Sequence, residues 1–408
     1  MRRLRFRSPR SNQASLAALV VGLVAVGGLV WGPLLPGSAR SVPITPALSV
    51  AIGGTVATVP VGAAPNGVAY DSGRGEVYVS NADSGDVSVI SDSINSVIAT
   101  VPVGNTPKGM AYDSEKGEIF LANEYSDDVS IVSDSSNTVV AYVAVGSGAA
   151  FEAYDSGKGE VFVTNYFSSN VSVIDDASNS VAATIPVGGN PLHLAYDEGN
   201  GEVFVASQLT GNVSVISDST NLVVATVSVG GGPSGVTYDS GKGDVYVTSA
   251  YSGTVSVINA TTNTIVTTAP TGADPRNAVY DGKAGIVLVT NFGTNSTTLI
   301  SDATATVAAT LTIGSNPQGI AIDSGTGEAF AANSGSDSVS VISVVGALLS
   351  GGGVASASPG AAGYVVAGVL GAGLGIMIGI LIGPQLRGRP PQVPGQDRGP
   401  TLPPGPAR

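Results

Sequence analysis

Cysteine is absent from the 408-residue chain, and histidine occurs once, as His193. The absence of cysteine excludes disulfides, thiolate metal sites and cysteine nucleophiles. A single histidine argues against a His-rich metal or haem site. The sequence has no P-loop and no dinucleotide-binding fingerprint, and no G-x-S-x-G nucleophile elbow lies near His193. We therefore expect no metal, no cofactor and no catalytic residues.

Charged residues are also scarce, at 12% of the chain. Ten of the 17 lysines and arginines lie outside residues 41–386, so this interior has 7 basic residues against 29 acidic ones and a net charge of −22. A surface of this sign repels phosphate backbones, which predicts no nucleic-acid partner. Glycine is abundant, at 56 residues, and Val, Thr and Ser are common. That composition predicts β structure with many turns, membrane segments, or both.

The first 40 residues have the composition of an export signal. Residues 1–10 carry five arginines, residues 16–35 carry no charge, and Gly37-Ser38-Ala39 resembles a small-residue cleavage site. Residues 1–40 therefore predict a signal peptide. Because the apolar run is longer than the typical signal-peptide core, an uncleaved signal anchor remains the alternative.

The C-terminal region predicts a membrane anchor. A Gly/Ser/Ala-rich linker at 345–360 leads into the apolar run 361–383, which is long enough to span a bilayer. Arg387 and Arg389 follow at the start of a Pro/Gly-rich tail, 384–408. Positive residues favour the cytoplasmic side, so we expect a cytoplasmic tail and an extracytoplasmic middle at the cell membrane. Small residues at steps of four in the span predict self-association, although glycine is common in spanning helices: Gly371, Gly375, Gly379 and Gly383.

The middle of the chain repeats every 42 residues. The repeat is marked by Asp71, Asp113, Asp155, Asp197, Asp239, Asp281 and Asp323. The first unit contains four short β-branched and aromatic runs, at 67–70, 76–79, 86–90 and 97–103, which turn-forming residues separate. Four strands in about 42 residues match one propeller blade. Each repeated aspartate begins a DSGxG-like turn, so we expect it to accept backbone N–H bonds rather than to bind metal.

The strand count predicts seven blades. An ATVPVG-like strand stands at 57–62, before the first inner strand, and none follows the run at 339–342. The N-terminal copy can therefore supply the outer strand of the last blade, which removes an exposed sheet edge. We expect an all-β chain: a seven-bladed β-propeller of four-stranded blades over residues 52–344, closed by an N-terminal strand, with hydrophobic helices at both ends.

The repeated motifs EVYVSN, EVFVTN, DVYVTS and IVLVTN, followed by VSVI and ATVPVG, resemble the YVTN family of β-propeller repeat proteins. The resemblance covers about residues 52–344. It implies a seven-bladed propeller of the kind found in archaeal and bacterial surface-layer or surface-antigen proteins. The family has no single assigned activity, so the resemblance predicts fold and location better than function.

Candidate site residues lie where the copies diverge. Fourth-to-first and second-to-third connections share one propeller face, where ligands usually bind. On it we expect the two basic residues Lys108 and Arg276, the single histidine, and Glu152, which replaces an apolar residue found in every other copy. Ligand-binding candidates are Lys108, Phe151, Glu152, His193, Arg276, Tyr125, Tyr166, Phe167, Tyr251 and Phe292. The aromatics could instead pack between blades.

Glu152 has two further interpretations. It could form a structural ion pair with His193, Lys108 or Arg276, because an unpaired buried carboxylate is costly. It could also form an acid–base pair with His193. Four sequons add possible glycan acceptors on loops, although Asn, Ser and Thr are abundant throughout: Asn170, Asn212, Asn259 and Asn295.

These observations predict a membrane-anchored, extracytoplasmic binding, adhesion or surface-layer protein without catalysis. Its partners would be cell-envelope proteins or glycans. The alternative is an extracytoplasmic lyase or hydrolase that uses Glu152 and His193.

Overall fold

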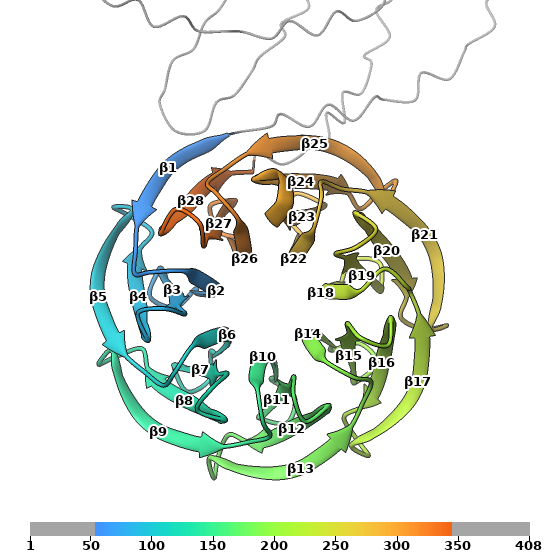
Figure 1. Cartoon of the computed structure of the whole chain (residues 1–408), viewed down its shortest axis with the longest axis horizontal. Coiled ribbons are helices and arrows are strands. Elements are labelled where there is room, and N and C mark those ends of the chain that lie inside the picture. Colours follow the sequence, from blue (N-terminus) through green and yellow to red (C-terminus); the bar gives the residue numbers. More distant parts are fainter. Residues whose placement is uncertain (1–53, 345–408) are drawn as a thin grey trace, which may run out of the picture. The chain divides into compact units, whose positions relative to one another are not determined.

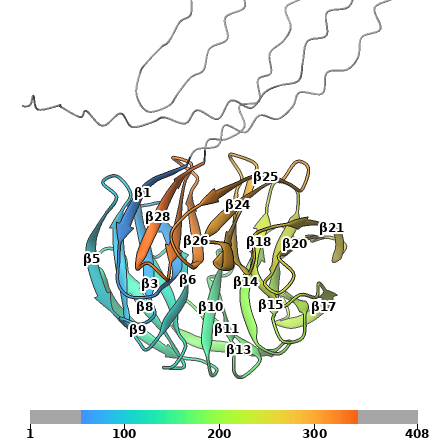
Figure 2. The ribbon, with the colours of Figure 1, turned by 45° about the horizontal axis from the view of Figure 1, so that its top comes forward.

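The computed structural model describes residues 54–344, and within them the chain forms seven four-stranded antiparallel sheets. The sheets radiate around a central channel, with β2, β6, β10, β14, β18, β22 and β26 innermost (Figures 1 and 2). The predicted all-β, seven-bladed propeller is thus confirmed. The predicted signal (1–40), linker (345–360), spanning helix (361–383) and tail (384–408) lie outside the described residues. So do the glycines of the predicted self-association stripe.

The first four blades follow the order of the chain. Blade 1 consists of β2 (Pro65–Asp71), β3 (Glu76–Asn81), β4 (Asp86–Ser91) and β5 (Ser96–Pro102). Blade 2 consists of β6 (Pro107–Asp113), β7 (Glu118–Asn123), β8 (Asp128–Ser133) and β9 (Thr138–Ala144). Blade 3 consists of β10 (Ala149–Asp155), β11 (Glu160–Asn165), β12 (Asn170–Asp175) and β13 (Ser180–Pro186). Blade 4 consists of β14 (Pro191–Asp197), β15 (Glu202–Ser207), β16 (Asn212–Ser217) and β17 (Leu222–Ser228).

The last three blades complete the ring. Blade 5 consists of β18 (Pro233–Asp239), β19 (Asp244–Ser249), β20 (Thr254–Asn259) and β21 (Thr264–Pro270). Blade 6 consists of β22 (Pro275–Asp281), β23 (Ile286–Asn291), β24 (Ser296–Ser301) and β25 (Thr306–Thr312), with the 3₁₀ turn η1 (Phe292–Thr294) after β23. Blade 7 consists of β26 (Pro317–Asp323), β27 (Glu328–Asn333), β28 (Ser338–Ser343) and β1 (Thr55–Pro60).

Blade 7 therefore combines segments from both ends of the propeller sequence. β1 pairs antiparallel with β28, from Thr55 opposite Ile342 to Pro60 opposite Ser338. Val59 is only 2% exposed, because it packs against an apolar cluster shared with blade 1. β1, which precedes the first repeat in the sequence, thus takes the place of the outer strand that the last repeat lacks.

The core lies between the blades. The second strand of each blade is buried along almost its whole length, because both of its faces meet neighbouring side chains. One large residue per blade recurs in this strand and inserts between the sheets: Tyr78, Phe120, Phe162, Phe204, Tyr246, Leu288 and Phe330. Outer strands instead expose most of their residues, for example Val56 at 55%. Most buried side chains of each repeat therefore lie in the interfaces between blades.

The repeated aspartates perform the predicted turn role. Asp71 Oδ1 accepts hydrogen bonds from the backbone N–H groups of Gly73 and Arg74, at 2.7 and 3.2 Å. The same pattern recurs in the other DSGxG-like turns. Gly75 adopts φ +67°, a conformation that favours glycine, so the final glycine of the turn has a conformational reason.

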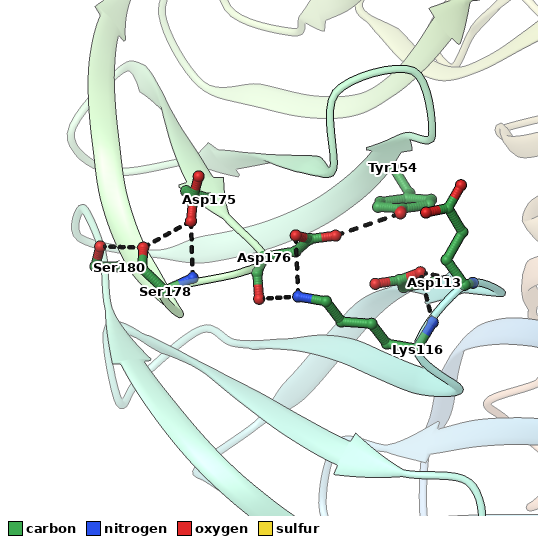
Figure 3. Close-up of polar contacts among 8 residues, drawn as sticks. Asp113, Lys116, Tyr154, Asp175, Asp176, Ser178 and Ser180 are labelled. Carbon is green, nitrogen blue, oxygen red and sulfur yellow. Dashed lines mark hydrogen bonds and ion pairs between the residues drawn. The ribbon is translucent and has the colours of Figure 1, made fainter.

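The face of the ring that carries these aspartate turns also has polar contacts between neighbouring blades (Figure 3). Lys116 of blade 2 pairs with Asp176 of blade 3, its Nζ lying 3.0 Å from Oδ1. Tyr154 donates to Oδ2 of the same carboxylate at 3.3 Å. Burial and the neighbouring Asp113 raise the pKa of Tyr154, so its hydroxyl stays protonated as a donor. Lys158 repeats the arrangement with Asp218 at 3.1 Å. Ion pairs on this face thus connect neighbouring blades of the ring.

Candidate functional site

The channel mouth on the face opposite the aspartate turns contains a cavity of about 240 Å³. Each of the seven blades contributes one lining residue, which is the second residue of its inner strand: Asn66, Lys108, Ala150, Leu192, Ser234, Arg276 and Gln318. The remaining lining residues are Phe151, His193, Glu124, Tyr166 and Gln208. We call the propeller surface around this cavity the mouth face. Five of the predicted candidates meet in the cavity: Lys108, Phe151, Tyr166, His193 and Arg276.

A β-bulge in each inner strand places these residues. In blade 4, Pro191 pairs with Ser207 and Leu194 pairs with Val205, so two residues oppose one. The bulged pair, Leu192 and His193, is released from the regular ladder. The same shift occurs in every inner strand. Bulges redirect side chains and are common beside binding sites.

The second bulge residue is glycine in four of the blades, for a steric reason. A Cβ atom at Gly67 would lie 2.2 Å from the Lys108 carbonyl oxygen, and one at Gly109 would lie 2.5 Å from Phe151. Gly235 and Gly319 are crowded in the same way. Blades 3, 4 and 6 carry side chains at this position instead: Phe151, His193 and Asn277. The aromatic pair in the mouth therefore stands where the ring otherwise favours glycine.

Phe151 and His193 stack face to face across two blades, with ring centroids 3.5 Å apart and an interplanar angle of 25°. His193 Nδ1 lies 3.1 Å from the Ser234 carbonyl oxygen. Burial lowers the pKa of His193 to about 3, and nearby Arg276 acts in the same direction. The imidazole is therefore neutral. Because a carbonyl only accepts, Nδ1 carries the proton and Nε2 is an acceptor.

Both cations of the mouth are neutralised by carboxylates of the protein. Lys108 Nζ lies 3.3 Å from Glu124 Oε2. Arg276 Nη2 donates to Asp274 Oδ2 at 2.7 Å. The Arg276 guanidinium carbon also lies 5.0 Å from the centroid of Phe292, within cation–π range. The mouth is thus polar but nearly neutral.

Glu152 does not form the expected ion pair, so that prediction is wrong. Both carboxyl oxygens are buried without a hydrogen-bond partner among residues 54–344. Burial raises the pKa of Glu152 well above its ordinary value, and the nearby backbone of Ala122 in blade 2 offsets only part of this effect. The corresponding Met110 belongs to the apolar cluster between blades 1 and 2. Burial in this apolar seam therefore favours the protonated form of Glu152, and the residue does not line the cavity.

The predicted aromatics divide into two groups. Tyr125, Phe167 and Tyr251 are exposed, at 64%, 52% and 77%, so interblade packing does not account for them. Tyr166 and Phe292 are half-buried. Tyr125 stacks with Phe167 at 6.3 Å, and Tyr166 meets Phe167 edge to face at 5.3 Å. An aromatic arc thus runs over blades 2 and 3 beside the cavity.

No family model matches the sequence, and no curated protein matches it either. Among solved structures, the chain is similar to the hydrazine synthase of Kuenenia stuttgartiensis, with a TM-score of 0.63 and 15% sequence identity. The match covers 75% of this chain and 99% of the other. At this identity the similarity shows the propeller fold alone. The resemblance to the YVTN family therefore stays a prediction.

Sequence reasoning missed Glu124 and Gln208 as mouth residues. Both occupy the first position after β7 and β15, the position that Tyr166 holds after β11. Comparison of the copies at this column, 42 residues apart, would have found them. The prediction at this connection rested on aromatic residues alone, whereas Glu124 and Gln208 are polar.

The four sequons lie mainly at strand ends rather than in loops. Asn170 and Asn212 begin β12 and β16, Asn259 ends β20, and all three are half-buried. Asn295 alone lies in a connection, exposed, after η1. Its backbone has φ +52° and its Oδ1 accepts from the Asn316 N–H at 2.8 Å. Glycosylation of these residues remains a prediction.

Two further features are absent from residues 54–344. Over this range, no cluster of three or more His, Cys, Asp or Glu side chains is arranged to hold a metal ion. The described part of the chain also has no helix of sufficient length and apolarity to cross a membrane.

Proposed function

We propose that the protein is a membrane-anchored, extracytoplasmic binding protein of the cell surface, which engages a cell-envelope protein or glycan through the mouth face. One observation carries this proposal. The repeat is regular where it builds the ring, and it diverges at the seven bulges that converge on one cavity. The exposed aromatics beside that cavity add contact surface of the kind that marks interaction sites.

The proposed location rests on the two ends of the sequence. The apolar segment 361–383 is followed by Arg387 and Arg389, and the apolar segment 16–35 follows five arginines. Both patterns favour a propeller outside the cytoplasm. A surface-layer or adhesion role agrees with the resemblance to YVTN proteins.

The alternative lyase or hydrolase receives less support from the geometry. Glu152 lies in an apolar seam outside the cavity, whereas His193 lines the cavity. An acid–base pair requires both groups within reach of one reacting atom. We therefore favour binding without catalysis.

The topology gives a direct test. Protease added to intact cells is expected to degrade the propeller and to spare an epitope fused to the C-terminal tail. Disrupted cells provide the control, because both parts then become accessible. A propeller that resists protease on intact cells but not in lysates would contradict the proposed location.

The role of the mouth face is tested by substitution of its exposed aromatics. A Tyr125→Ser, Phe167→Ser, Tyr251→Ser variant of the full-length chain in detergent is expected to lose at least about ten-fold in affinity for envelope components. Tyr142→Ser on the outer strand β9 is the matched control, because this tyrosine is 59% exposed away from the mouth. Equal capture of envelope fractions by all variants would overturn the assignment of this face.

A further inference from the structure

We propose that the mouth cavity binds the terminal residue of an uncharged, hydroxyl-rich glycan, with His193 Nε2 accepting a hydrogen bond from a ligand hydroxyl. This inference rests on the proposed binding function and narrows its ligand to one chemical class.

The first argument is the unsatisfied hydrogen-bonding capacity of the cavity. His193 donates from Nδ1 to the Ser234 carbonyl, which leaves Nε2 as an acceptor. Nε2 is buried, and within residues 54–344 it has no partner. A buried polar atom without a partner is unfavourable, so the site is prepared for a ligand that supplies a donor.

Within residues 54–344, an unpartnered donor belongs to another residue that lines the cavity. Arg276 Nε is also buried without a partner among the described residues. The two residues are connected through Ser234, because its carbonyl accepts from His193 Nδ1 and its Oγ donates to the backbone carbonyl of Arg276 at 3.0 Å. A hydroxyl both donates and accepts, so hydroxyl groups of one ligand satisfy both atoms. Gln208, Gln318 and Asn66 extend the polar lining with amides that do the same.

The second argument is charge. Lys108 and Arg276 each have a carboxylate of the protein at ion-pair distance, so neither offers an uncompensated positive charge. Residues 54–344 contain 7 basic and 29 acidic residues. The resulting field repels an anionic ligand. An uncharged ligand avoids this cost, whereas a carboxylated or phosphorylated one does not.

The third argument is size and shape. At about 240 Å³ the cavity is smaller than the ~300–1,000 Å³ typical of sites that enclose a drug-sized ligand. It therefore suits a single ring, with the rest of a larger ligand outside. Phe151 lines the cavity, and Tyr125 and Phe167 form the stacked pair beside it. Flat aromatic faces carry partial negative charge, which attracts the C–H groups on the face of a sugar ring.

The test measures binding of defined trisaccharides to the full-length chain in detergent. Neutral probes are trimers of glucose, mannose and N-acetylglucosamine, and the acidic probe is trigalacturonic acid. At least one neutral trimer is expected to bind, and His193→Phe is expected to weaken that binding by about ten-fold or more. This variant keeps a ring for stacking on Phe151 and removes the acceptor. Lys158→Met, on the opposite face, is the matched control and is expected to leave binding unchanged.

Each outcome separates this inference from the broader proposal. Binding of the acidic trimer alone would overturn the uncharged ligand class, and the same holds if no trimer binds while the chain still captures envelope components. In both cases the proposed binding function would stand. Failure to bind any trimer or any envelope component would overturn both. If a neutral trimer binds equally well to the folded His193→Phe variant, the hydrogen bond assigned to Nε2 is wrong.

Discussion

Replacing Glu152 with methionine is expected to raise the free energy of unfolding by about 1–3 kcal/mol at neutral pH. The carboxyl group lies in the seam between blades 2 and 3 without a hydrogen-bond partner among the described residues. Met110 fills the corresponding position between blades 1 and 2, so a side chain of this length fits the seam. Denaturant titration of both proteins measures the difference.

The gain depends on pH. Burial raises the pKa of Glu152, so the folded protein retains a proton that the unfolded chain releases above about pH 4.5. Folding stability therefore falls as pH rises, by about 1.4 kcal/mol per unit until the pKa of the folded state is reached. The advantage of Glu152→Met should grow over the same range. Parallel stability curves for the two proteins would show that the pKa of Glu152 is the same in the folded and the unfolded state.

His193 has the opposite effect on stability at lower pH. Its pKa is lowered to about 3, so the folded protein excludes a proton that the unfolded chain binds below about pH 6.5. Stability is therefore lost as pH falls from about 6.5 towards 3. Between about pH 4.5 and 6.5 the two slopes oppose each other. The summed contribution of these two residues to stability is therefore flat in that range and declines on both sides.

Placing a charge at Val59 is expected to cost more than about 3 kcal/mol of stability. Val59 is 2% exposed on β1, the strand that joins the start of the propeller to its last blade. Val59→Asp buries an unpaired carboxylate in the cluster shared by blades 7 and 1. The loss of β1 would also leave β28 with an unpaired edge, which promotes association.

Val56→Asp is the matched control for this variant. Val56 lies three residues earlier on β1 and is 55% exposed, so its replacement should change the unfolding free energy by less than about 0.5 kcal/mol. Thermal unfolding by circular dichroism and light scattering report stability and association together. Equal melting temperatures for the two variants would show that the packing of β1 does not hold the ring.

The repeat made the fold predictable, because the 42-residue period combines strand-like runs with turn residues of defined conformation. Asp71 and Gly75 show why: one caps a turn and the other adopts a positive φ, and both requirements are local. Glu152 was misread because its environment is set by blade 2, which is distant in sequence. Its identity as a charged residue suggested pairing, whereas its register in the inner strand directs it into the seam.

Part of the mouth could also be predicted. Lys108, His193 and Arg276 were selected as departures from the repeat, and the cavity collects all three. The neutral tautomer of His193 and the pairing of Lys108 with Glu124 required the structure, because that ion pair joins the start of β6 to the connection after β7 in blade 2. Asp274, in contrast, lies only two residues from its partner Arg276. Departure from the repeat thus identifies residues of the binding surface, whereas the pairing of their charges depends on distances between side chains.

The inner-strand bulges separate two tasks that most binding proteins combine in the same residues. A side chain in a bulge lies outside the regular ladder, so its replacement leaves the pairing of the four strands intact. The seven first bulge positions, from Asn66 to Gln318, accordingly carry seven different residues around one opening. Substitutions at these positions change the selectivity of the opening without changing the strand pairing of the ring.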